Sequence, residues 1–230
     1  MKEAADISVQ GASATDAMSD RLQALLEAAN QPPVTTAQHA LFASYLHLIL
    51  RWNARMNLTA IRSEEGILSR HFVESIVCAR AIPNNVKSLL DFGSGAGFPG
   101  VPIAICRPEI AVTLAESQGK KAAFLQEVAR SLGLSAAVYH GRAEGIGSQF
   151  DCVVLRAVDS MEAAVATAAG LVSRKGVLAL MTTEGGFPGL RAAAGPGFTW
   201  GERVGTAGSE SLFLALGRQS NFPARGGHER

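Results

Sequence analysis

The sequence lacks the features that mark membrane, secreted or metal-binding proteins. None of its apolar runs approaches the ~18 residues that span a membrane. Its first twenty residues have no apolar stretch like that of a secretory signal, so we expect a cytoplasmic protein with no membrane association. The three cysteines, Cys78, Cys106 and Cys152, form no CxxC pair, and we expect buried free thiols rather than a disulfide or a metal site.

Aromatic residues and net charge are also scarce. Only 6% of the 230 residues are aromatic, and the formal net charge is +1. The charges are nevertheless uneven, because residues 1–50 carry two basic and five acidic side chains whereas residues 51–88 carry six and three. A basic segment beside a ligand pocket suits a phosphate-bearing partner, but a solvated helix face gives the same count, so charge alone leaves both open.

The hydrophobic pattern divides the chain near residue 86. Residues 18–85 contain three apolar stretches at helical spacing, which predict a helical subdomain that ends near Pro83. The two ends, residues 1–17 and 218–230, are small, polar and without periodicity, which predicts disorder.

Residues 86–217 show short apolar runs that alternate with amphipathic ones. Five runs predict strands, over residues 86–92, 111–116, 136–140, 152–156 and 177–181. Three stretches between them predict helices, over residues 101–106, 120–132 and 161–172. Two late runs, 199–204 and 211–216, have no helix between them and predict an antiparallel hairpin at the sheet edge. The alternation indicates an α/β fold with a doubly wound, mostly parallel sheet, which follows the helical subdomain in the sequence.

A glycine-rich stretch, LDFGSGAGFPGVP (90–102), follows the first predicted strand. In a doubly wound sheet the ligand binds outside the carboxyl ends of the strands, so this turn is the predicted ligand site. Glycines permit a positive φ and let a ligand lie against the main chain. The helix that follows offers free N–H groups and a partial positive charge.

The spacing of the glycines separates the candidate ligands. A triphosphate loop needs a Gly-Lys-Ser/Thr step, and no lysine lies between Lys87 and Lys120. A dinucleotide fingerprint needs glycine where this chain has Phe98. The pattern is instead an acid, Asp91, two residues before a G-x-G-x-G run, and that run consists of Gly93, Gly95 and Gly97.

This arrangement resembles the first motif of Rossmann-like S-adenosylmethionine methyltransferases. The resemblance implies a second acid at the end of the next strand, and Glu116 stands there, 19 residues after Gly97. A carboxylate at that place can accept both ribose hydroxyls, so the cofactor implied is S-adenosyl-L-methionine. A nicotinamide site or a purely structural turn are the alternatives. Asp91 is expected either to touch the cofactor or to orient the glycine turn through backbone N–H bonds.

A longer match points to one family. The segments NLTAI (57–61), RHFVES (70–75), DFGSGAGFPGVPIAI (91–105), ES..KK..FL (116–125), GRAE (141–144) and LRAV (155–158) resemble, in order and spacing, the small-subunit ribosomal RNA methyltransferase G family, also called glucose-inhibited division protein B. That resemblance implies a class I methyltransferase fold with a seven-stranded sheet and an N-terminal helical segment. It also implies methylation of N7 of one guanine in bacterial 16S rRNA.

The resemblance also implies site residues. Gly93 and Phe98 would contact the cofactor at the glycine turn, Ala143 and Glu144 would lie beside its adenine, and Arg156 would close the pocket. Because N7 of guanine has a lone pair and no proton, no general base is required, and Arg156 is the candidate catalytic residue. Its alternative role is a structural ion pair, with Asp159 as the expected partner.

The partner implied is 16S rRNA or the small ribosomal subunit, bound by a monomer. The predicted RNA-binding residues are Arg62, Arg70 and His71, although a solvated helix face is the alternative for the latter two. Three aromatic residues at helical spacing are predicted to be core rather than base-stacking platforms: Tyr45, Trp52 and Phe72.

Three departures from the family pattern fall on the target side of the site. Leu155 stands where relatives usually have Ser, Met181 lies near a usual Lys, and Ser209 to Ser211 contain no Arg. They leave open an alternative function, a methyltransferase-fold protein that binds RNA or ribosomes with lost or altered catalysis. A small-molecule methyltransferase is a third possibility, which would leave the basic helical segment unexplained.

Overall fold

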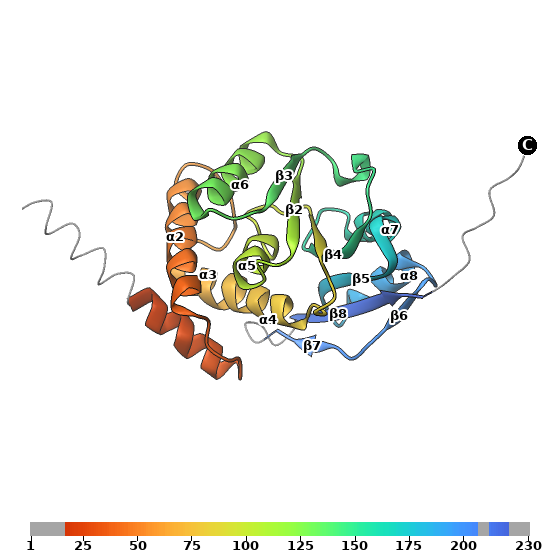
Figure 1. Ribbon diagram of the computed structural model, residues 1–230, viewed down its shortest axis with the longest axis horizontal. Coiled ribbons are helices and arrows are strands. Elements are labelled where there is room, and N and C mark those ends of the chain that lie inside the picture. Colours follow the sequence, from red (N-terminus) through yellow and green to blue (C-terminus); the bar gives the residue numbers. More distant parts are fainter. Residues whose placement is uncertain (1–16, 207–211, 221–230) are drawn as a thin grey trace, which may run out of the picture.

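The computed structural model describes residues 17–206 and 212–220, and its centre is one mixed β-sheet with helices on both faces (Figure 1). The strand order is β3-β2-β1-β4-β5-β8-β6, and β7 pairs with β8. The first five strands in this order are parallel, and β8 runs antiparallel to β5, β6 and β7. The carboxyl ends of β1 to β4 therefore meet at one edge of the sheet.

The strands are short except for the two that join the parallel and antiparallel parts. Their bounds are β1 Ser88–Phe92, β2 Ala111–Glu116, β3 Ala137–His140, β4 Phe150–Arg156, β5 Val172–Thr183, β6 Phe198–Trp200, β7 Val204–Gly205 and β8 Leu212–Gln219. The inner strands β1 and β4 are almost continuously buried, as expected for parallel strands covered on both faces.

Helices surround this sheet and precede it. A first helix covers residues 17–28. It is followed by α2 Thr36–Asn53, α3 Glu64–Ile67, the π-helix η1 Leu68–Val73, α4 Glu74–Ala81, α5 Gly100–Cys106, α6 Gly119–Leu132, the 3₁₀-helix η2 Ala143–Gly145, α7 Met161–Leu171 and α8 Phe187–Ala194. A capping box formed by Thr35 and Gln38 begins α2, and Gly133 in the left-handed conformation ends α6.

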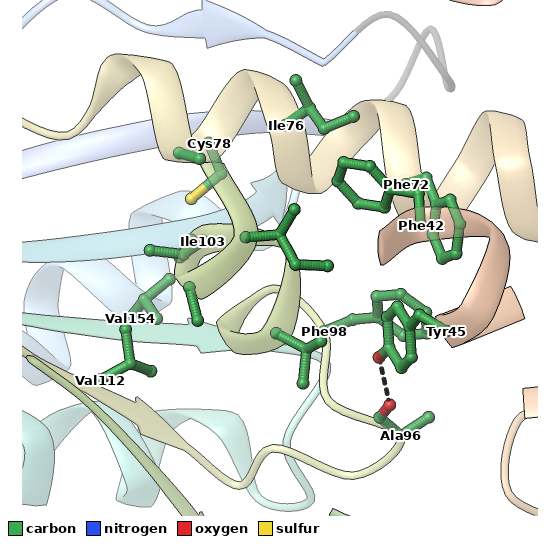
Figure 2. Packing of buried hydrophobic residues seen from close by; sticks show 14 of the residues in the cluster. Phe42, Tyr45, Phe72, Ile76, Cys78, Ala96, Phe98, Ile103, Val112 and Val154 are labelled. Atoms are coloured by element: carbon green, nitrogen blue, oxygen red, sulfur yellow. Dashed lines mark hydrogen bonds between the residues drawn. The ribbon is translucent and has the colours of Figure 1, made fainter. Parts of the chain in front are cut away.

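The two faces of the sheet carry separate apolar clusters. The larger cluster joins the N-terminal helices to α5, α6 and one sheet face, and Figure 2 shows its centre, with Phe42, Tyr45 and Phe72 close to Phe98 of the glycine-rich stretch. The second cluster lies under α7 and α8. Residues on both sides of residue 86 thus share one core.

The predicted sheet with helices on both faces is confirmed, and its central strands lie where the sequence placed them. The predicted number of seven strands is wrong, because the run over 199–204 is interrupted by Gly201 to Arg203 and forms both β6 and β7. The predicted antiparallel pairing at the sheet edge is confirmed: β8 lies between β5 and the edge strand β6, and it also pairs with β7. Helix α8 was not predicted, because the Gly-Gly-Phe-Pro sequence at its start favours a turn.

The predicted disordered ends overlap with regular structure where the structure describes them. Ala17 belongs to the first helix, and β8 continues through Arg218 to Gln219, so the boundary expected after residue 217 falls inside a strand. Residues 1–16, 207–211 and 221–230 lie outside the described residues, and Ser209 to Ser211 are among them.

The three thiols are free, with Cys78 and Cys152 buried and Cys106 half-buried. No helix within residues 17–206 and 212–220 is long and apolar enough to cross a bilayer.

Candidate functional site

The carboxyl ends of β1 to β4 open into a cleft of about 300 Å³. Its lining combines the glycine turn after β1, the end of β2, η2 after β3 and the turn between β4 and α7. Five of the predicted cofactor residues line it, namely Gly93, Gly95, Glu116, Ala143 and Glu144. The cleft lies where a doubly wound sheet binds its ligand.

Two glycines of the turn are required for different reasons. Gly93 lines the cleft with φ +75°, so the main chain itself forms the wall there. Gly97 has φ +94° and lies against the helical segment, where a Cβ atom would stand 2.7 Å from both the Tyr45 hydroxyl and a Val101 methyl. The first glycine therefore exposes backbone to a ligand, and the second allows the helices to approach the turn.

Asp91 is buried and stabilises the glycine turn through a hydrogen bond to the main chain. Its side chain is only 1% exposed, and Oδ2 accepts the backbone N–H of Gly100 at 3.0 Å. Burial raises the pKa of Asp91 to about 7, against the opposing effect of the Gly100 hydrogen bond. Asp91 does not line the cleft, so its geometry is that of a residue that orients the turn.

Glu116 links the turn to the end of β2 and faces the cleft. One carboxylate oxygen accepts the N–H of Gly95 at 2.9 Å, and the other accepts the N–H of Gln118 at 2.7 Å. Each carboxylate oxygen has two lone pairs, so both can still accept a hydroxyl donor from the cleft. This is the geometry expected of a ribose-binding acid.

The remaining wall comes from η2 and from the turn after β4. Exposed Glu144 pairs with Arg142 at 2.9 Å on the rim, beside buried Ala143. Ala157 and Ser160, which also line the cleft, have φ values of 48° and 52°, in a region that residues other than glycine rarely adopt. Such backbone conformations gather at functional sites.

Sequence reasoning missed part of the lining. The missed residues follow β2 and β4 directly and include Ser117, Gln118, Lys121, Val158 and Asp159. Their position after parallel strands was the available signal, since every such loop reaches the same edge of the sheet.

Arg156 lies beside the cleft and does not line it, contrary to the predicted role in closing the pocket. It forms an ion pair with Glu74 of α4, and its Nη2 donates to the carbonyl of Arg70 at 2.7 Å. Glu74 is fully buried and the Arg156 side chain is 11% exposed. The structural ion pair therefore exists, but with Glu74 in place of the expected Asp159. Burial raises the pKa of Glu74, and Arg156 opposes that rise.

Phe98 and His71 pack on each other instead of facing the cleft. Their rings are stacked with centroids 4.4 Å apart, and His71 Nε2 lies 2.9 Å from the Thr59 hydroxyl. Burial, aided by Arg156 and Arg70, lowers the pKa of His71 to about 3, so the imidazole is neutral. Phe98 was predicted to contact the cofactor and His71 to contact RNA, and neither lines the cleft.

Arg62 and Arg70 are exposed, and Arg70 lies beside the carboxyl end of β4, where its carbonyl accepts from Arg156. Arg62 donates to the Asn57 side chain at 2.7 Å, and Arg70 belongs to the π-helix η1, a type of irregularity common at functional sites. Both guanidinium groups are placed where an approaching anion can reach them.

The helical segment is fastened to the glycine turn itself. Tyr45 is fully buried in α2, and its hydroxyl donates to the carbonyl of Ala96 at 2.6 Å (Figure 2). Phe72 stacks on Tyr45 with centroids 5.4 Å apart. The N-terminal helices thus fix the shape of the ligand-facing turn. Tyr45 and Phe72 are core, as predicted, whereas Trp52 is only half-buried.

Comparison with known proteins agrees with this geometry. A family model described as rRNA small subunit methyltransferase G matches residues 38–189. A protein named ribosomal RNA small subunit methyltransferase G from Roseiflexus sp. (strain RS-1) is 49% identical over 124 residues, covering 51% of this chain and 53% of that protein. A protein of the same name from Xanthomonas axonopodis pv. citri (strain 306) is 39% identical over 162 residues, covering 69% and 74%. The chain spans about half the length of the first curated relatives that it matches.

Solved structures show the same architecture. The structure of the mitomycin 7-O-methyltransferase MmcR matches with a TM-score of 0.57 and 14% identity, over 80% of this chain and 68% of that one. At this identity the likeness concerns the fold alone. The fold is therefore that of class I methyltransferases, as the sequence predicted.

Proposed function

The chain belongs to the rRNA small subunit methyltransferase G family, and from this premise we propose that it transfers a methyl group from S-adenosylmethionine to 16S ribosomal RNA. The acceptor atom in this proposal is N7 of a guanine. The protein would act in the cytoplasm, where ribosomes are assembled. We propose that it acts as a monomer.

The residues present fit the cofactor. Gly93 and Gly95 leave main chain open to the cleft, and Glu116 has free lone pairs on both carboxylate oxygens for ribose hydroxyls. Ala143 and the neighbouring apolar residues Val158 and Ala164 offer a surface for a flat adenine ring. When bound, S-adenosylmethionine supplies a methyl group on a sulfonium, which a lone pair can attack directly.

The protein's own residues supply position and electrostatics. Because guanine N7 carries no proton, no side chain has to accept one, and the acids of the cleft serve as hydrogen-bond acceptors. Glu116 and the glycine turn would fix the cofactor, while the β4–α7 turn would limit how the base approaches. We propose that Arg156 acts as a positioning residue, holding the end of β4 against η1 and α4.

One observation carries the proposal: Glu116 binds the glycine turn through Gly95 N–H and at the same time faces the cleft. A purely structural turn would not require a buried carboxylate with acceptor capacity directed at an open cavity. A triphosphate site would require a cation in the loop, and residues 93–100 contain none.

Transfer of labelled methyl groups into small ribosomal subunits, followed by nucleotide mapping, tests the proposal. We expect label on one guanine of 16S rRNA. The variant Glu116→Gln should lose at least tenfold in affinity for S-adenosylmethionine, because a hydrogen bond to a charged group contributes ~1.5–3 kcal/mol. The exposed residue Glu202, far along the chain, provides the control Glu202→Gln.

Other outcomes separate the alternatives. Binding to the subunit without any transfer would favour an RNA-binding protein with lost catalysis. Transfer to a base atom other than N7 would contradict the acceptor proposed here, while leaving the family and the cofactor in place.

A further inference from the structure

A further hollow lies between the end of α2 and the first half of α6. It has a volume of about 480 Å³ and is lined by Arg51, Trp52, Arg55, Met56, Lys120 and Glu127; we call it the α2–α6 groove. Figure 1 shows α2 and α6 side by side at the left of the molecule. Trp52 joins them, because its Nε1 donates to Glu127 at 2.8 Å and its ring packs edge-on against Phe124.

The charges of the α2–α6 groove are only partly balanced. Arg51 is paired with Glu127. Arg55 and Lys120 are exposed, and neither makes a side-chain hydrogen bond or an ion pair with any residue that the structure describes. Two uncompensated cations therefore face one hollow, which is the electrostatic pattern of a phosphate site.

The position of Lys120 adds an independent argument. Lys120 and Lys121 occupy the first turn of α6, which contains no acidic residue. A cation at a helix N-terminus is opposed by the helix dipole. Two adjacent lysines there are locally unfavourable, and an anion bound at this place would remove the penalty.

The groove and the cofactor cleft are connected through adjacent residues of α6. Lys121, the neighbour of Lys120, lines the cleft, as does Gln118 one turn earlier. A strand of RNA with one base at the cleft would therefore pass over the α2–α6 groove.

We propose that the α2–α6 groove binds one nucleotide of the RNA substrate outside the target base. Arg55 and Lys120 hold its phosphate, and the exposed parts of Trp52 and Met56 receive its base. The combination of cations with an aromatic face is typical of single-stranded nucleic acid sites, whereas an acidic peptide would need no aromatic platform. The inference rests on the proposed function, since it assigns a further contact to the same substrate.

The test uses the full chain and 16S rRNA. RNA affinity is measured at rising salt for the wild type, for the double variant Arg55→Ala/Lys120→Ala, and for the control Lys175→Ala/Arg191→Ala, which removes two exposed cations elsewhere. Arg55 and Lys120 are proposed to hold one phosphate, and a lost phosphate contact lowers the salt slope by ~0.7 for single strands, so we expect a decrease of about 0.7 in the double variant. The control should keep the wild-type slope, and all three should keep their affinity for S-adenosylmethionine.

Fluorescence gives a second measurement. The chain has two tryptophans, so Trp200→Phe leaves Trp52 as the only reporter. A short single-stranded RNA should quench it, and polyglutamate should not. Equal quenching by polyglutamate would overturn the nucleotide assignment.

The outcomes distinguish this inference from the proposed function. If wild type binds and methylates RNA but the double variant keeps its slope, the groove assignment alone is wrong. If the slope decreases as expected but no methyl transfer occurs, the groove is supported and the proposed activity fails. If the wild type binds no RNA, both are overturned.

Discussion

The buried ion pair between Glu74 and Arg156 joins the start of α4 to the end of β4, and its partners lie 82 residues apart. We expect Glu74→Gln to lower the free energy of unfolding by ~3–5 kcal/mol, because it leaves the Arg156 charge buried without a counter-charge. Urea unfolding of the variant and the wild type measures this difference. The exposed control Glu202→Gln should stay within ~0.5 kcal/mol, and an equally small effect of Glu74→Gln would contradict the assigned burial.

His71 should make the protein sensitive to acid. The pKa of His71 is about 3 in the folded state and 6.5 as a free side chain. Below pH 6.5 the unfolded chain therefore binds a proton that the folded chain does not bind. This contribution to stability is complete above pH 6.5 and is lost as the pH falls toward 3, by at most ~1.4 kcal/mol per pH unit. The free energy of unfolding of His71→Gln, measured by urea titration, should therefore rise relative to that of the wild type as the pH is lowered from 7 to 5. A difference that does not change with pH would contradict the prediction.

Among the elements, the glycine turn depends on contact with α2. Gly97→Ala adds a Cβ at φ +94°, 2.7 Å from the Tyr45 hydroxyl, so we expect a loss of ~1–3 kcal/mol in stability and weaker binding of S-adenosylmethionine. Gly170 of α7 is the matched control, because an added Cβ meets no atom within 4 Å. Gly170→Ala should stabilise by ~0.5–1 kcal/mol, since alanine favours the helix. Calorimetric titration and thermal unfolding measure both effects, and similar results for the two variants would rule out the crowding argument.

Elements whose signal is local could be predicted from the sequence, and elements that depend on distant contacts could not. The strand over Ala111–Glu116 was predicted to the residue, because most of its residues are apolar and buried, as is typical of a parallel strand covered on both faces. The π-helix η1 has no such signature, and the single run predicted over 199–204 did not show the interruption that divides it into β6 and β7. In the site, the spacing from Gly97 was sufficient to predict Glu116, which lines the cleft. The partner of Arg156 could not be predicted, because nothing local in the sequence marks Glu74 as a buried residue.

The whole molecule should unfold as one unit, although the sequence suggests a division near residue 86. The larger apolar cluster contains Leu22 and Phe42 from the first helices together with Leu114 and Phe124 from the sheet part, so neither part has a complete core of its own.

The two tryptophans report on opposite regions, Trp52 on α2 and Trp200 on β6. In Trp200→Phe, the fluorescence of Trp52 should follow the same urea transition as the far-ultraviolet circular dichroism of that variant. In Trp52→Phe, the fluorescence of Trp200 should likewise coincide with the dichroism, because both signals report a single transition. An earlier transition seen by Trp52 alone would show that the helical segment unfolds separately, and the glycine turn would then lose the support of Tyr45 before the sheet unfolds.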